Sequence, residues 1–171
     1  MSKKVYDENG KFIGTEDIVV VNREPSPKEV AIRKAEEIIA SQTVKNGKFG
    51  GEFCSLVVMD LEGYPTASVL TAAKSDGIKQ IWFGTQVDSN KAIRAKNNPK
   101  ASVHYGTGEH SVTLTGEIEI LVDEATRKAI WYDGLSEHFP EGVNDPNYCV
   151  LSFKTKKYNL FVDWEETIGE L

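Results

Sequence analysis

Residues 65–91, PTASVLTAAKSDGIKQIWFGTQVDSNK, combine two β-prone segments, two turns and the start of a helix. The first segment belongs to a strand predicted over residues 64–72, and the second is a strand predicted over residues 80–85. Ser75-Asp76-Gly77 between them has the composition of a tight turn. Asp88-Ser89-Asn90 is typical of a helix start, because Ser and Asp cap the free amides there. The stretch therefore predicts strand, turn, strand and helix in close succession.

Most of the remaining chain is also β-prone, and three helices are expected. Ser26-Pro27-Lys28-Glu29 is a strong helix start, in which Ser26 caps the helix and Glu29 completes a capping box. Strands at 53–59, 64–72 and 80–85 are separated by short turns, which predicts an antiparallel meander. The expected helices are 26–41, 91–96 and 124–135, and the other expected strands are 101–105, 111–122, with a bulge at Gly116, 148–153 and 158–164.

About seven strands and three helices without regular βαβ alternation predict a mainly β (α+β) fold, an antiparallel β-barrel with flanking helices. A chain of 171 residues has the length of one ordinary domain. We expect residues 1–25 to form an N-terminal extension or small ribbon, with a hairpin turn at Asn9-Gly10, and residues 26–171 to form the main domain. Ile18-Val19-Val20-Val21 is a further short β-prone run in the extension.

The composition excludes several classes of partner. A formal net charge of −6 argues against duplex nucleic acid, whose binding requires a basic face. No apolar run reaches membrane-spanning length, and the start lacks a secretory signal, so we expect a cytoplasmic protein without a membrane partner. Cys54 and Cys149 lie in apolar runs and are predicted to be reduced core residues. His104, His110 and His138 lack metal-ligand spacing, so no metal site is expected.

A candidate anion site follows from the helix start. Ser89, Asn90 and Lys91 place a hydroxyl, an amide and an ammonium where backbone N–H groups and the helix dipole favour negative charge. Lys74 ends the preceding strand segment and carries a second cationic group. Each residue also has a structural interpretation, since Ser89 is an effective cap without a ligand, Thr85 suits a strand end, and a lone lysine is usually solvated. A small phosphorylated ligand is the functional alternative.

In this order and spacing, the motifs resemble those of the pyridoxamine-phosphate-oxidase-like split-barrel family, and within it the bacterial general stress protein branch. The resemblance extends more weakly over residues 31–164. Its motifs are a strand ending in lysine, a strand ending in aromatic-x-Thr, Ser-x-Lys opening a helix, and Asn-Pro after that helix. In this sequence they are Val69-Leu70-Thr71-Ala72-Ala73-Lys74, Trp82-Phe83-Gly84-Thr85, Ser89-Asn90-Lys91 and Asn98-Pro99.

The resemblance implies a Greek-key split barrel that binds FMN as a homodimer, with the flavin at the subunit interface. Carried over by position, Lys91 and Asn90 would meet the phosphate, with Ser89 nearby, and Lys74 would lie close to the same phosphate or the ribityl chain. The remaining implied contacts are backbone groups of Val69, Leu70 and Thr71 at the ring edge, Gly84 and Thr85 beside ring and chain, and Ser111 where the oxidases place a partner-subunit glutamine.

Two departures from the family pattern bear on activity. The oxidases begin the first motif with arginine, where this chain has Val69, and they carry an Arg and a His near the C-terminus that this chain lacks. Pyridoxamine-phosphate oxidation itself is therefore not expected. The resemblance instead implies a flavin-dependent oxidoreductase or flavin reductase acting on an unidentified small molecule, with a nicotinamide nucleotide as one candidate donor. The alternatives are a non-catalytic FMN-binding stress module and a barrel holding another cofactor, such as haem or a deazaflavin.

Overall fold

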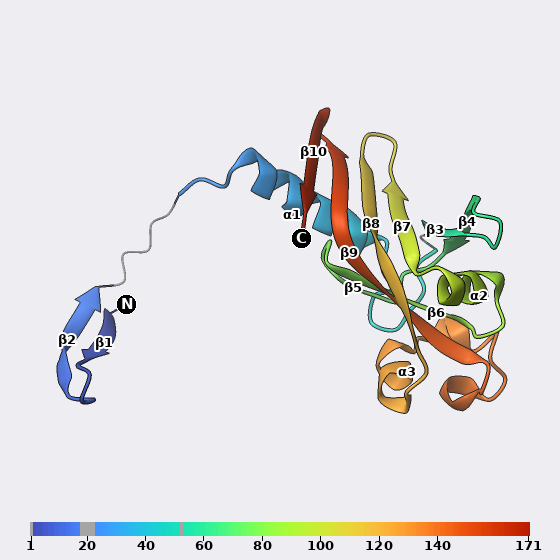
Figure 1. Cartoon of the computed structure of the whole chain (residues 1–171), viewed down its shortest axis with the longest axis horizontal. Helices are drawn as coiled ribbons and strands as arrows, with labels where there is room; N and C mark the ends of the chain where they lie inside the picture. The colour runs from blue at the N-terminus through green and yellow to red at the C-terminus, as the bar shows by residue number, and fades with distance from the viewer. Residues whose placement is uncertain (1, 18–22, 52) are drawn as a thin grey trace.

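The N-terminal residues form a separate two-stranded sheet. In the computed structural model, which describes residues 2–17, 23–51 and 53–171, β1 (Ser2–Tyr6) pairs antiparallel with β2 (Phe12–Asp17) (Figure 1). Gly10 N–H donates to the Asp7 carbonyl at 2.9 Å across the turn. The hairpin predicted around Asn9-Gly10 is therefore confirmed, whereas the β-prone run at residues 18–21 lies outside the described residues.

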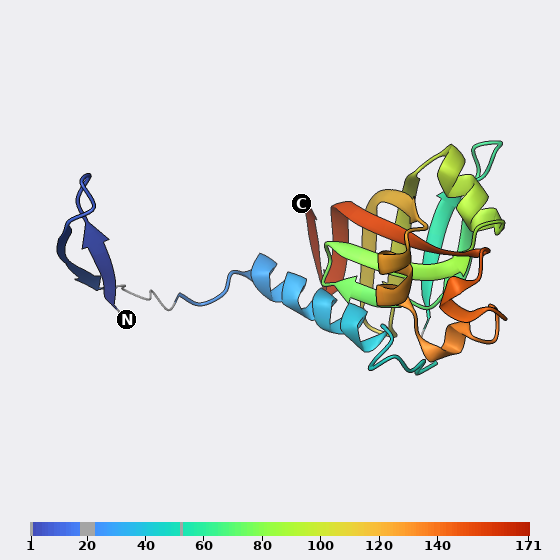
Figure 2. The same cartoon turned by 90° about the horizontal axis from the view of Figure 1, so that it is seen from below.

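The second sheet has eight strands and forms the body of the protein. Its strands follow the order β4-β3-β7-β8-β9-β6-β5, with β10 paired to the free part of β9, and all these pairings are antiparallel (Figures 1 and 2). The predicted mainly antiparallel β fold is confirmed. The strands are β3 (Cys54–Met59), β4 (Pro65–Leu70), β5 (Lys74–Asp76), β6 (Gln80–Gln86), β7 (Lys100–Gly106), β8 (Ser111–Leu121), β9 (Tyr148–Val162) and β10 (Glu165–Glu170).

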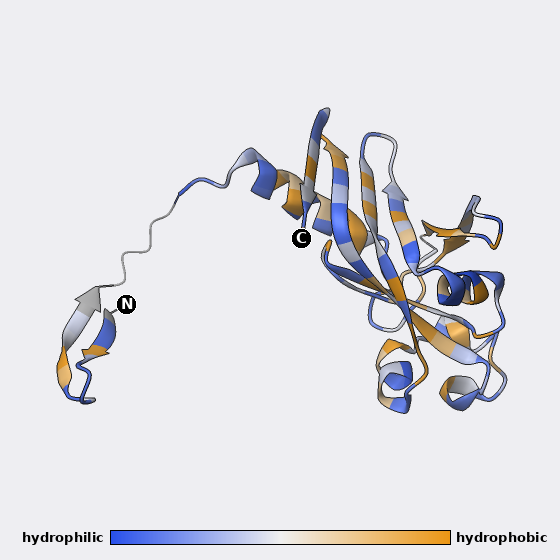
Figure 3. Ribbon diagram, viewed as in Figure 1, coloured by the Kyte–Doolittle hydropathy of each residue, from blue (hydrophilic) through white to orange (hydrophobic). Residues whose placement is uncertain are grey.

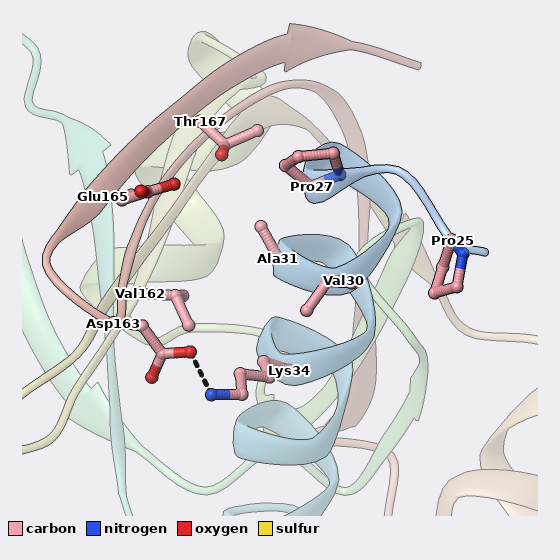
Figure 4. A pocket seen from close by; sticks show the side chains of 9 residues that line it. All are labelled: Pro25, Pro27, Val30, Ala31, Lys34, Val162, Asp163, Glu165 and Thr167. Atoms are coloured by element: carbon pink, nitrogen blue, oxygen red, sulfur yellow. Dashed lines mark hydrogen bonds and ion pairs between the residues drawn. The ribbon is translucent and has the colours of Figure 1, made fainter.

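Three α-helices and two short 3-10 helices accompany the sheet in the part of the chain that the structure describes. The helices are α1 (Pro27–Ser41), α2 (Asn90–Asn97) and α3 (Glu124–Ile130), and the 3-10 helices are η1 (Asp133–Leu135) and η2 (Gly142–Asn144). Figure 4 shows where α1 meets the β9–β10 hairpin: Lys34 forms an ion pair with Asp163, and Val30 lines the same small hollow as Val162. Within the described ranges, none of the helices is long and apolar enough to cross a membrane.

Two pairing predictions were wrong. β3 and β4 pair as expected, but β6 pairs with β9 and β5 rather than continuing the meander from β4. The β6–β9 ladder runs from Gln80↔Lys154 to Gln86↔Tyr148 and is longer than the three-residue β5–β6 pairing. In addition, the strands expected at 148–153 and 158–164 are one strand, β9, because the polar segment between them continues the ladder with β8.

Two element boundaries also differ from the prediction. The helix expected to reach residue 135 ends at Ile130, since Trp131 has an extended backbone (φ −64°, ψ 138°), and η1 follows. The predicted turn at residues 75–77 overlaps β5.

The strand β10 was not predicted, because its sequence, EETIGE, has the charged composition with which edge strands avoid further pairing.

Side chains along the strands alternate between two packed regions, and this alternation positions the candidate site. Along β6, Ile81, Phe83 and Thr85 are buried on the barrel side, and Trp82 packs on the other side against a second cluster. Figure 3 shows the corresponding hydrophilic and hydrophobic bands along β7, β8 and β9. The second cluster is built mainly from residues after α3 and includes Leu135. Both cysteines are free and buried, as predicted.

The start of α1 yields a first testable prediction. Ser26 Oγ accepts the Glu29 N–H at 3.3 Å, and the Glu29 carboxylate accepts the Ser26 N–H at 2.7 Å, which is the predicted capping box. Hydrogen bonds from Ser26 lower the pKa of Glu29 to about 2. Ser26→Ala should lower the free energy of unfolding by about 1 kcal/mol, or the melting temperature by roughly 2–4 °C. Thermal unfolding followed by circular dichroism measures this, and equal shifts for Ser26→Ala and the exposed-site control Glu37→Ala would contradict it.

Candidate functional site

The end of β6 and the start of α2 bring three predicted site residues together. Lys91 Nζ donates to Thr85 Oγ1 at 3.1 Å, and Thr85 Oγ1 lies 3.3 Å from Ser89 Oγ. Ser89 caps α2 by accepting the Ala92 N–H at 3.3 Å. The close spacing arises because the chain turns from strand to helix within four residues, with the Ser89 N–H donating to the Gln86 carbonyl. Two hydroxyls and one ammonium therefore converge at a helix N-terminus.

Among the described residues, no acidic side chain balances the charge on Lys91. Burial lowers the pKa of this half-buried lysine, and no Asp or Glu oxygen of the described residues lies within 4.0 Å of its ammonium. The thiol of Cys149 contributes no charge at neutral pH, because burial raises its pKa to about 11. Lys34, by contrast, is paired with Asp163 beside the hollow in Figure 4. A half-buried, uncompensated ammonium favours an anionic ligand at Lys91.

A cavity of about 320 Å³ opens beside this cluster. Its volume lies at the lower end of the range of small-molecule sites. Six of the ten predicted site residues line this cavity. There the residues at the end of β4, which the resemblance assigns to the flavin ring edge, meet residues of β6. These six are Val69, Leu70, Thr71, Gly84, Thr85 and Lys91, and the other lining residues are Phe53, Gln86, Tyr132, Leu135, His138 and Phe139.

Lys74 and Asn90 lie outside the lining of this cavity. Lys74 begins β5 opposite Trp82, and its Nζ lies 5.6 Å from the centroid of the Trp82 ring. Asn90 is exposed at the start of α2 and lines a smaller hollow with Asp60 and Glu62. The predicted convergence of two lysines is thus not seen in the single chain, and the phosphate roles of Lys74 and Asn90 stay predictions.

Ser111 does not line this cavity. It begins β8, where it pairs with Gly106 of β7 and with Phe161 of β9. The flavin contact that the resemblance implies for Ser111 therefore stays a prediction.

One wall of the cavity was not predicted from the sequence. It comes from residues 132–139, which follow α3 and include Tyr132, Leu135, His138 and Phe139. Arg127 holds the end of this connection by donating to the Asp145 carbonyl and lying over the Tyr148 ring, 5.4 Å from its centroid. The only sequence signal for this wall was its grouping of aromatic residues, and the prediction had assigned part of this segment to a helix.

The family comparison supports the fold. The family model described as "Pyridoxamine 5'-phosphate oxidase like" matches residues 48–168. No curated protein sequence matches the chain significantly.

Solved structures share the fold at low sequence identity. A Clostridium acetobutylicum protein related to general stress protein 26 of B. subtilis is 24% identical, with a TM-score of 0.71 over 85% of this chain and 97% of that one. General stress protein 26 of Bacillus anthracis is 19% identical, with a TM-score of 0.63 over 80% and 98%. A heme-binding protein of Mycobacterium smegmatis is 17% identical, with a TM-score of 0.63 over 86% and 59%. At these identities the likeness concerns the fold.

Proposed function

The chain belongs to the pyridoxamine 5'-phosphate oxidase like family, and from this membership we propose that it binds FMN in the cavity beside Lys91. The observation that carries the proposal is the ammonium of Lys91, which has no acidic partner among the described residues and is held by Thr85 next to the cap of α2. We propose further that the protein is a flavin-dependent oxidoreductase or flavin reductase that acts on a small molecule.

The groups present fit a phosphate ester. Lys91 supplies a charge-assisted donor, and the hydroxyls of Thr85 and Ser89 lie beside it. The first amides of a helix have no intrahelical partner, and Ser89 occupies only that of Ala92, so the N–H groups of Asn90 and Lys91 are available. A dianionic phosphate would satisfy these donors together.

The rest of the cavity suits the other end of the cofactor. The flavin supplies the electron chemistry, so the residues of this chain need only bind, orient and exclude water. Leu70, Leu135 and Phe139 provide apolar surface, and Thr71 lies at the end of β4 where backbone groups can meet a ring edge. Pyridoxamine-phosphate oxidation is not proposed, since Val69 stands where the oxidases have arginine.

A homodimer is part of the proposal. Val69 is 69% exposed on the edge strand β4, so the ring end of the cavity is open in a single chain. A second copy of the chain would close this opening, and the partner contact that the resemblance implies for Ser111 would then be made across the interface. Sedimentation of the FMN-loaded protein should give the mass of a dimer.

Haem is the second candidate, because His138 lines the cavity and one relative is a heme-binding protein. Titration with FMN and with hemin, followed by absorption spectroscopy, separates the two cofactors. We expect the spectrum of bound flavin, unchanged in His138→Ala, and no Soret band that depends on this residue. A Soret band lost in His138→Ala, together with no FMN binding, would replace the proposal by the haem alternative.

Turnover is tested separately from binding. Anaerobic mixing of the FMN-loaded protein with NADH or NADPH should bleach the flavin absorbance in a saturable manner if the protein is a reductase. An FMN complex that neither donor reduces would favour the non-catalytic binding module.

A further inference from the structure

We propose that Tyr132 is a ligand-binding residue that holds the flavin ring, independently of the phosphate held by Lys91. The inference rests on the proposed FMN site and adds to it a residue from outside the motifs of residues 65–91. Tyr132 immediately precedes η1 and lines the cavity together with Leu135. It is the aromatic hydroxyl among the lining residues, and it belongs to the wall formed by residues 132–139.

The phenol is held in a defined position. Its hydroxyl is hydrogen-bonded to the Thr71 side chain, which connects the wall to the end of β4. The next residue anchors the backbone, since the Asp133 N–H donates to the Gly47 carbonyl at 3.0 Å. Burial raises the pKa of Tyr132 above its usual value, so the phenol stays protonated at neutral pH and retains a proton to donate.

Two glycines allow close packing, one within the wall and one between the wall and the sheet. A Cβ on Gly134 would lie 2.8 Å from Cε2 of Tyr132, so the absence of a side chain there lets the phenol ring lie against the turn. A Cβ on Gly84 would lie 2.8 Å from Cδ1 of Leu135, so the wall packs directly over β6. The ring of Tyr132 is therefore positioned by packing as well as by its hydrogen bond, before any ligand enters.

The lining of the cavity combines two chemistries. Lys91 and Thr85 supply an ammonium and a hydroxyl, whereas Leu70, Leu135 and Phe139 supply apolar surface. This arrangement fits a ligand with an anionic group at one end and a planar ring carrying hydrogen-bond acceptors at the other. An aromatic side chain can stack on such a ring, and the phenol can donate to a ring carbonyl or nitrogen.

Ligands with and without the phosphate separate the two residues. Tyr132→Leu should weaken the binding of both FMN and riboflavin by about threefold to tenfold. Lys91→Ala should weaken FMN only, because riboflavin has no phosphate. Dissociation constants come from titrations followed by flavin fluorescence, with Tyr64→Leu as the matched control, because Tyr64 is 64% exposed and does not line the cavity.

A second variant distinguishes loss of the hydroxyl from loss of the folded structure. Tyr132→Phe keeps the ring and removes the hydroxyl, and we expect it to weaken riboflavin by about threefold to tenfold, with a changed visible spectrum of the bound flavin. Unchanged riboflavin affinity and spectrum in Tyr132→Phe and in folded Tyr132→Leu would overturn the inference while leaving the FMN site intact. Wild-type protein that binds FMN but no riboflavin would also overturn it. Absence of FMN binding by the wild type would instead remove the proposed function.

Discussion

Replacing Lys91 with alanine should raise the dissociation constant for FMN by about 10- to 150-fold, because a charge-assisted contact to phosphate is lost. Thr85 and Ser89 would remain but carry no charge, so they cannot replace the ammonium. Riboflavin affinity should stay the same, since its binding involves no phosphate. Titration of the folded variant with both flavins measures the two effects together.

The control for this experiment lies on the same helix. Lys96 is an exposed lysine in the last turn of α2, and Lys96→Ala changes the net charge of the protein by the same amount. Its FMN affinity should match that of the wild type. Equal losses in Lys91→Ala and Lys96→Ala would indicate a general electrostatic effect, and no loss in either would contradict the phosphate site.

The pH dependence of FMN affinity follows from the same residue. Burial lowers the pKa of Lys91 from its usual 10.5, so the ammonium is lost as pH rises through the lowered value. The affinity for FMN should fall on that alkaline side. It should also fall as pH drops below about 6, where the phosphate takes up its second proton. Lys91→Ala should lack the alkaline decrease but keep the acidic one.

Gly116→Ala should destabilise the protein by about 3 kcal/mol, because the new side chain has no space in the sheet. A Cβ on Gly116 would lie 1.9 Å from the Lys154 carbonyl oxygen of β9, which is backbone and cannot rotate away. The pairing of β8 with β9 shifts register between Thr115 and Gly116, so the predicted bulge is confirmed. The alanine would have to separate these two strands at the centre of the sheet.

Thermal unfolding measures this second effect. A loss of about 3 kcal/mol corresponds to a decrease in melting temperature of roughly 6–12 °C for a domain of this size. Gly108→Ala is the matched control, because Gly108 lies between β7 and β8 and a Cβ there would meet no atom within 4 Å. Similar melting temperatures for Gly116→Ala and the wild type would show that β8 and β9 can adjust at the bulge.

Much of the fold was predictable from local sequence. The capping box of Ser26 and Glu29, the cap at Ser89 and the alternation along β8 each depend on residues close together in the chain. These signals predicted α1, α2 and most strands near their observed positions. The prediction failed for the β6–β9 pairing, because residues such as Thr85 and Cys149 are separated by more than sixty positions and no local signal relates them.

The residues of the candidate site likewise fall into those that local sequence predicts and those that only tertiary packing brings in. Local sequence was sufficient to bring Thr85, Ser89 and Lys91 together, because a strand end followed by a capped helix fixes their relative positions within seven residues. Tertiary packing alone adds Tyr132 and the rest of its wall, since their contact with β6 and Thr71 depends on how the chain after α3 folds back over the sheet. Hydrogen-bonded caps are short-range interactions, whereas the cavity exists only where surfaces distant in the sequence meet.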